Sequence, residues 1–202
     1  MLLHGWGANA QDVAAVASYI NLPNYQFFFP NAPFPFPYGG QGRVWYNFPE
    51  NYSFTSHPNF GEQAELQASR QQLTEWLRSL ESVTGIPLSR TVLAGFSQGG
   101  AMTFDVGLRL PLAAILVLSG YLHAPIAPDS IDLATVPKVF MVHGISDTVV
   151  PLFAAQEARD SLISLNIPVE YQELNMGHEI PLTVLNKMQS FIEEKIELSD
   201  PL

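Results

Sequence analysis

Cysteine is absent from this chain of 202 residues. Its absence excludes a disulfide framework, a thiolate nucleophile and a zinc site with cysteine ligands. A chain without disulfides fits a reducing compartment, and we expect a cytoplasmic protein. The first residues, Met1-Leu2-Leu3-His4-Gly5, carry neither the basic start nor the small-residue cleavage site of a secretory signal peptide.

Basic residues are scarce as well. Lysine and arginine together number 9 against 19 aspartates and glutamates, which leaves a formal net charge of −10. This excess of negative charge disfavours nucleic acid and anionic membrane as partners. No apolar stretch approaches the ~20 residues of a membrane-spanning helix, so we expect no integral membrane association.

Apolar residues, in contrast, are abundant. They make up 47% of the chain, against 14% for charged residues, which is the composition of a globular protein with a buried core. The length suits one domain over residues 1–202. A segment over about residues 30–60 is rich in proline, glycine and aromatic residues, and a loop this long in a compact domain is usually functional.

Short apolar runs alternate with segments of helical periodicity along the chain. Strands are expected over residues 1–3, 25–29, 91–94, 113–118, 139–143 and 169–174, and helices over residues 10–20, 61–84, 98–110, 152–165 and 180–196. Asn9 is placed to cap the first helix, and Gly85 to end the second. The alternation predicts an α/β fold with about six strands in a mostly parallel sheet and helices on both faces. The three-residue first strand is shorter than the usual ~5–6 residues, and we expect an N-terminally shortened sheet whose ancestral chain began further upstream.

Ligands of parallel sheets bind beyond the carboxyl ends of the strands, and the turn after the expected strand over residues 91–94 has the strongest pattern. The segment Gly95-Phe96-Ser97-Gln98-Gly99-Gly100 places G-x-S-x-G between a buried strand and a helix, the context of a nucleophile elbow. Glycine two residues before and after the serine relieves the crowding of this strained turn. The alternative is an ordinary glycine-rich turn with an N-capping serine.

Two later strands are followed by an acid and a base. Asp147 lies in a short loop after residues 139–143, and His178 follows the last strand. The chain order Ser97, Asp147, His178 is that of the α/β-hydrolase triad, in which histidine accepts the serine proton. Each residue could alternatively cap or begin the adjacent helix.

The loop after the first strand supplies candidate oxyanion donors. The backbone N–H of Trp6, between Gly5 and Gly7, is expected to pair with the N–H of Gln98 in stabilising an oxyanion. His4 is expected to brace this loop through a hydrogen bond. His143 is expected to be a packed structural residue, and His57 and His123 to shape the rim or to have no role.

The chain resembles the carboxylesterase/phospholipase branch of the α/β-hydrolases, which includes acyl-protein thioesterases. The matching residues are Leu3-His4-Gly5-Trp6-Gly7, Pro30-Asn31-Ala32-Pro33, Trp45-Tyr46, Gly95-Phe96-Ser97-Gln98-Gly99-Gly100, His143-Gly144-x-x-Asp147-x-x-Val150-Pro151 and Gly177-His178. The resemblance implies a Ser97–His178–Asp147 triad, an oxyanion hole at Trp6 and Gln98, and hydrolysis of esters or thioesters without a cofactor or metal. Members normally carry further strands before the His-Gly pair, so the exposed sheet edge expected here leaves a homodimer open.

Aromatic residues are concentrated in the long loop, where they could cover an acyl or aromatic substrate or simply pack the loop. The candidate substrate contacts are Trp45, Tyr46, Tyr121 and Val150. The leading interpretation is a serine carboxylesterase for small or medium acyl esters. The alternatives are an acyl-protein thioesterase or lysophospholipase for longer chains, and a non-catalytic binding module of the same fold.

Overall fold

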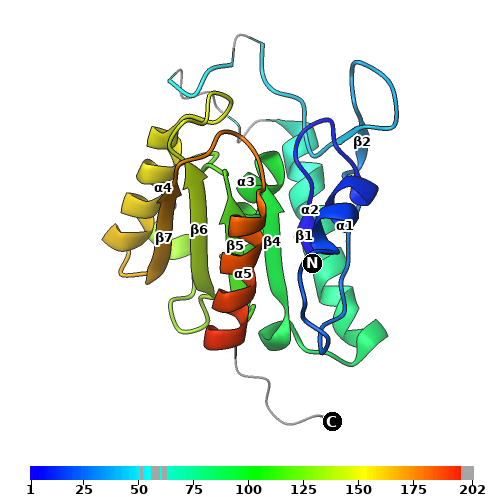
Figure 1. Ribbon diagram of the computed structural model, residues 1–202, viewed down its shortest axis with the longest axis vertical. Coiled ribbons are helices and arrows are strands. Elements are labelled where there is room, and N and C mark those ends of the chain that lie inside the picture. The colour runs from blue at the N-terminus through cyan, green and yellow to red at the C-terminus, as the bar shows by residue number, and fades with distance from the viewer. Residues whose placement is uncertain (51, 56–59, 61–62, 197–202) are drawn as a thin grey trace.

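A five-stranded parallel sheet forms the centre of the computed structural model, which describes residues 1–50, 52–55, 60 and 63–196 (Figure 1). Across the sheet the strands follow the order β1 (Leu2–Leu3), β4 (Val92–Phe96), β5 (Ala114–Leu118), β6 (Lys138–Gly144) and β7 (Val169–Leu174). Two further short strands, β2 (Phe34–Pro35) and β3 (Arg43–Val44), pair antiparallel within the long loop segment.

Helices cover both faces of the sheet. They are α1 (Ala10–Ala17), α2 (Ala64–Thr84), α3 (Gln98–Gly107), α4 (Leu152–Ser164) and α5 (Leu182–Lys195), with short 3-10 turns η2 (Leu88–Arg90) and η3 (Pro128–Ser130). In Figure 1, α1 and α5 lie in front of the sheet, and α2 and α3 lie behind it. The fold class expected from the sequence is therefore confirmed.

The two faces arise from the alternation of side chains along each buried strand. In β5, Ile115 and Val117 join the core that contains residues of α2, α3 and α4. Their neighbours Leu116 and Leu118 join the second core, with residues of α1 and α5. Because both faces are buried, the strand has no polar side and reads as a continuous apolar run.

The main sheet has five strands, one fewer than expected, because residues 25–29 do not form a strand. The segment runs beside β1, and the N–H of Leu2 donates to the carbonyl of Phe28 at 3.0 Å. Since β1 has only two residues, it offers too short an edge for a regular ladder. Its apolar side chains are buried in another way: Phe28 packs against the core beside α2, and Phe29 packs against the core beside α1.

Helix ends follow their local sequence signals. The Asn9 side chain accepts the N–H groups of Gln11 and Asp12, and Asp12 accepts the N–H of Asn9 in return. This reciprocal capping box starts α1. Gly85 ends α2 with a φ of 73°, in the left-handed region that favours glycine.

A crevice forms where the connections after β1 and β4 diverge. The two strands are neighbours, with Leu3 opposite Gly95. The chain continues from β1 to α1 on one face and from β4 to α3 on the other face. Loops that separate in this way open a ligand site at the carboxyl edge of the sheet. Within the described ranges, no helix is long and apolar enough to cross a membrane.

The contact between α3 and the end of β1 leaves no room for a side chain at Gly99. A Cβ there would lie 2.6 Å from the carbonyl oxygens of both Leu3 and His4. Gly99→Ala should therefore lower the free energy of unfolding by about 2–3 kcal/mol, measured by urea denaturation. Gly177→Ala is the matched control, because a Cβ there meets nothing within 4 Å. Equal urea midpoints for the two variants would contradict this packing.

Candidate active site

Ser97 occupies a strained turn between β4 and α3. Its φ and ψ are 55° and −118°, a conformation that side-chain-bearing residues rarely adopt. The turn is held by the N–H of Ser97, which donates to the carbonyl of Leu118 at 2.9 Å. A Cβ on Gly95 would lie 2.2 Å from the carbonyl oxygen of Gly99. Glycine before and after the serine is therefore a steric requirement of this turn.

Asp147 and His178 meet beyond the ends of β6 and β7. The two loops are joined because the N–H of Ser146 donates to the carbonyl of Met176 at 3.1 Å. A Cβ on Gly144 would lie 2.5 Å from the carbonyl oxygens of Met176 and Gly177, so the loops pack closely. His178 Nδ1 lies 2.7 Å from Asp147 Oδ2. This contact leaves the Nε2 edge of the imidazole as its free face.

The Asp147 carboxylate is buried and fully paired. Its Oδ1 accepts the N–H groups of Val149 at 2.9 Å and Val150 at 2.8 Å, while Oδ2 accepts from His178. Burial alone would raise the pKa of Asp147, but the hydrogen bonds from His178 and the two amides outweigh it and lower the pKa below its ordinary value. The group is therefore an ionised acceptor that fixes the orientation of the imidazole.

His143 supports the loop that contains Asp147 and Val150. The ring is buried, and its Nε2 lies 2.8 Å from the carbonyl of Val150, to which it donates. Burial lowers the pKa of His143, so the ring is neutral. Its expected structural role is confirmed, because it holds the residue whose N–H binds Asp147.

The loop after β1 passes directly beside Ser97. A Cβ on Gly5 would lie 3.3 Å from Ser97 Cβ. The N–H of Gly7 donates to the carbonyl of Arg43 at 3.0 Å, and the N–H of Ala8 donates to the carbonyl of Gly5. The N–H of Trp6, in contrast, has no backbone acceptor among the described residues. The N–H of Gln98 is the first of α3 and has no partner inside the helix.

His4 braces this loop, as expected. Its Nδ1 lies 2.8 Å from the carbonyl of Gly5, and its Nε2 accepts the N–H of Ala32 at 3.0 Å. The ring is therefore a neutral tautomer with the proton on Nδ1. Burial lowers the pKa of His4, which agrees with a neutral, structural ring.

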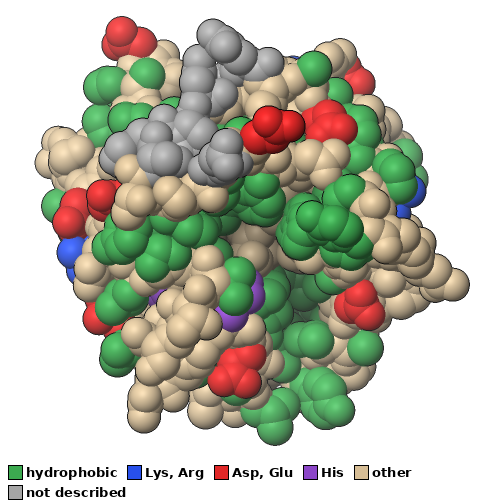
Figure 2. Space-filling model, turned by 90° about the horizontal axis from the view of Figure 1, so that it is seen from above, with side chains coloured by type: hydrophobic (Ala, Val, Ile, Leu, Met, Phe, Trp, Pro, Cys, Tyr) green, Lys and Arg blue, Asp and Glu red, His purple; other side chains and the backbone are tan. Residues whose placement is uncertain are grey.

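A cleft of about 580 Å³ brings Ser97 and His178 together. Its other lining residues are mainly apolar: Gly5, Trp6, Ala8, Asp12, Val13, Val16, Phe48, Tyr52, Phe54, Phe96, Tyr121, Val149, Val150, Glu179 and Ile180. Figure 2 shows a hollow with hydrophobic side chains around it and a histidine at its side. The sequence-based candidates Tyr121 and Val150 lie in this wall. The contribution of α1, through Val13 and Val16, was missed, although the apolar spacing of that helix is visible in the sequence.

Trp45 and Tyr46 do not line the cleft, which corrects their expected role as substrate contacts. Trp45 is 3% exposed, and its indole N–H donates to the carbonyl of His4 at 3.0 Å. The Gln98 side chain secures both residues, because it accepts the N–H of Trp45 and donates to the carbonyl of Tyr46. These two aromatics therefore fix the loop beneath the cleft.

His123 also departs from its expected place on the rim. It is buried and hydrogen-bonded to Asp105 and Tyr46. His57 lies outside the described residues. Among the residues that the structure describes, no group of three or more His, Asp or Glu side chains could hold a metal ion.

Comparisons with known proteins show the family of this chain. Residues 1–196 match the sequence model of a family described as Phospholipase/Carboxylesterase. The chain is 28% identical to lysophospholipase-like protein 1 of Mus musculus, over 95% of this chain and 84% of that protein. It is 30% identical to acyl-protein thioesterase 1 of Neurospora crassa, over 96% and 82% of the two chains.

Solved structures show the same fold. The crystal structure of esterase PE8 has 30% identity and a TM-score of 0.80, with 96% of this chain and 91% of that chain covered. The crystal structure of SOBER1 of Arabidopsis thaliana has 24% identity and a TM-score of 0.79, with 97% of each chain covered.

The lowered pKa of Asp147 has a consequence for stability. A carboxyl group whose pKa is lowered on folding stabilises the protein above its unfolded pKa, and this stabilisation is lost as pH falls through the folded pKa. Asp147→Asn should therefore be less stable than the natural chain near pH 7, and this difference should shrink below the ordinary aspartate pKa of 3.8. Thermal unfolding from pH 7 to pH 3 measures it. A difference that stays constant across this range would contradict the assignment.

Proposed function

The chain belongs to the phospholipase/carboxylesterase family and is a serine hydrolase of carboxylic esters, and we propose that Ser97, His178 and Asp147 are its catalytic triad. One observation carries this proposal. A strained serine and a histidine that is held by a buried carboxylate at 2.7 Å line the same apolar cleft. A structural serine has no need of such a turn, and strain of this kind is found at functional sites.

The proposed reaction proceeds in two halves. Ser97 Oγ attacks the carbonyl carbon of the ester while His178 Nε2 accepts its proton. The backbone N–H groups of Trp6 and Gln98 stabilise the oxyanion that develops. His178 then returns the proton to the departing alcohol, which leaves an acyl group on Ser97. Water, activated by the same imidazole, hydrolyses this acyl-enzyme and restores the serine.

Asp147 acts through His178 in this scheme. Its carboxylate holds the tautomer in which Nδ1 carries the proton, and its negative charge stabilises the imidazolium that forms during attack. The hydrogen bonds from Val149 and Val150 keep the carboxylate oriented. These contacts support a fixed base rather than a mobile surface histidine.

A second candidate is hydrolysis of long-chain acyl groups, as thioesters on protein cysteines or as lysophospholipids. The names of the mouse and Neurospora crassa relatives favour it. So does the side chain of Trp6, which lines the cleft and is 37% exposed. The two candidates share the triad and differ in the length of the acyl chain that the cleft accepts and in the leaving group.

Ser97→Ala should lower kcat for p-nitrophenyl butyrate by about 10³-fold or more, because no other group can form the acyl-enzyme. The variant should unfold at nearly the same temperature as the natural chain. Ser82→Ala, at an exposed position of α2, is the matched control and should retain full turnover. Normal turnover in purified Ser97→Ala would remove Ser97 from the mechanism.

The two substrate candidates are separated by a series of p-nitrophenyl esters from acetate to palmitate. We expect the highest kcat/KM for short acyl chains, because aromatic residues close the wall of the cleft. The same preparation is tested on a palmitoylated cysteine peptide. A maximum at octanoate or longer, together with release of palmitate from the peptide, would contradict the short-chain prediction and favour the second candidate.

A further inference from the structure

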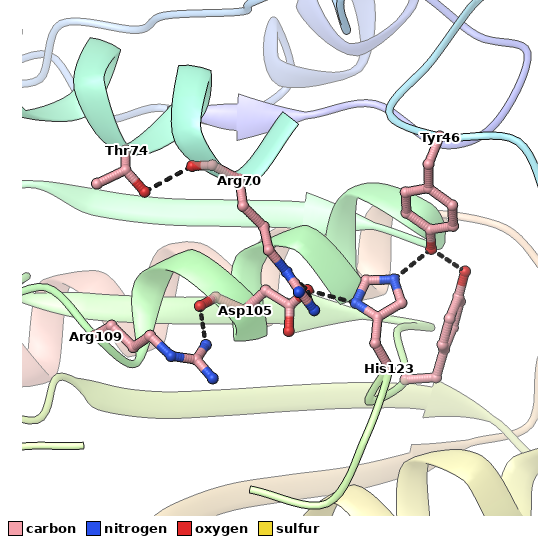
Figure 3. A network of polar contacts seen from close by, with 7 residues as sticks. Tyr46, Arg70, Thr74, Asp105, Arg109 and His123 are labelled. Carbon is pink, nitrogen blue, oxygen red and sulfur yellow. Dashed lines mark hydrogen bonds and ion pairs between the residues drawn. The ribbon is translucent and has the colours of Figure 1, made fainter. Parts of the chain in front are cut away.

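A chain of buried hydrogen bonds runs from α2 to the wall of the cleft (Figure 3). Arg70 of α2 binds Asp105 of α3, with Nη2 2.7 Å from Oδ2. The same Oδ2 lies 2.5 Å from His123 Nδ1, and His123 Nε2 lies 2.6 Å from the hydroxyl of Tyr46. The Tyr46 hydroxyl lies 2.6 Å from the hydroxyl of Tyr121. None of these contacts involves Ser97, His178 or Asp147.

The charge of Asp105 sets the direction of the hydrogen bonds that end on its carboxylate. Burial raises the pKa of Asp105, but His123 and Arg70 outweigh it, so that the pKa is lowered and the carboxylate is an acceptor. His123 therefore donates to the carboxylate through Nδ1, and its Nε2 is left to bond the Tyr46 hydroxyl. The Tyr46 hydroxyl in turn bonds the hydroxyl of Tyr121, and either oxygen can be the donor. Burial raises the pKa of both tyrosines, so they remain protonated donors.

Tyr121 stands between two cavities. Tyr52, Phe54 and Tyr121 line both the cleft at Ser97 and a second cavity of about 760 Å³ beside α4. The Phe54 and Tyr121 rings meet edge to face, with centroids 5.0 Å apart. Tyr121 also packs with Ala101, which lies one helical turn after Ser97. The Tyr121 ring is therefore part of the wall between the two cavities.

The backbone end of Tyr121 is fixed by close packing. A Cβ on Gly120 would lie 2.5 Å from Val117 Cγ1 and 3.0 Å from the carbonyl carbon of Gly100. Ser119, just before it, has a φ of 46°. The backbone is thus pressed against α3, and the far end of the ring depends on its hydroxyl contact with Tyr46.

We propose that Asp105, His123 and Tyr46 are positioning residues that hold the Tyr121 ring as the wall limiting the length of ester the cleft accepts. The inference rests on the proposed ester hydrolysis and names its specificity-determining residue. With the ring anchored, an extended arm of the substrate stops at Tyr121. With the ring released, the arm can pass beside Phe54, which lines both cavities, into the second cavity.

The test uses Tyr46→Phe, which removes only the hydroxyl that anchors Tyr121. The Tyr46 ring contacts to Phe48 and Phe60 have centroid distances of 5.7 Å and 5.6 Å and are retained in this variant. Two series of esters are measured: p-nitrophenyl esters of lengthening acids, and acetates of lengthening alcohols. In the series whose lengthening arm extends toward Tyr121, the ratio of kcat/KM for the C8 ester to that for the C2 ester should rise about ten-fold. The kcat for the C2 ester should stay within about three-fold of the natural value, because the triad is untouched.

Substitutions of His123 separate positioning from a general loss of stability. His123→Phe fills the same space without hydrogen bonds and should change the C8 to C2 ratio in the same direction. His123→Gln can still bridge Asp105 and Tyr46 and should restore most of the natural ratio. Leu77→Ala, in the buried face of α2, lowers stability but removes none of these hydrogen bonds. It should therefore leave the ratio unchanged.

Tyr121→Leu provides an independent measurement, because it shortens the wall itself and should also admit longer esters. A natural ratio in Tyr46→Phe, His123→Phe and Tyr121→Leu, with turnover still dependent on Ser97, would overturn the positioning role and leave the proposed function intact. A natural chain that already prefers C8 esters would overturn it as well. Loss of turnover in the natural chain itself would overturn both.

Discussion

The backbone turn at Ser97 is the constraint around which the carboxyl edge of the sheet is built. Its positive φ can be held only because α3 packs tightly onto β1 and β4, and this packing requires glycine at Gly95 and Gly99. The same closeness brings the loop after β1 within contact of Ser97, at Gly5. The nucleophile and the oxyanion donors are therefore positioned by one set of backbone contacts, before any side chain is considered.

Burial of polar groups explains the rest of the site. The Asp147 carboxylate has three donors, and their hydrogen bonds overcome the cost of removing its charge from water. Asp105 is held in the same way by Arg70 and His123. The Asp147–His178 and Asp105–His123 pairs thus have different surroundings. His178 lines the cleft, whereas His123 faces the hydroxyl of Tyr46 inside the protein.

Much of the fold could be predicted from the sequence because its signals are local. The cap at Asn9, the helix end at Gly85 and the apolar runs of β5 and β6 each depend on neighbouring residues. The nucleophile turn could be predicted for the same reason. Residues 25–29 could not, because their apolar pattern fits a strand and only the two-residue length of β1 denies them a partner.

The wall of the cleft was less predictable, since its contacts join residues far apart in the chain. His123 binds Asp105, 18 residues away, and Tyr46, 77 residues away, and no periodicity records such pairs. Trp45 and Tyr46 were expected at the substrate because they are aromatic, but their polar atoms bind the backbone of His4 and the Tyr121 hydroxyl instead.

Trapping the covalent intermediate tests the central claim most directly. The natural chain is mixed with p-nitrophenyl butyrate, quenched in acid within milliseconds, digested and analysed by mass spectrometry. The account predicts one butyryl group on the peptide that contains Ser97, formed in step with the burst of p-nitrophenol. A burst with the acyl group on another residue, or turnover with no acylated peptide at any quench time, would contradict it.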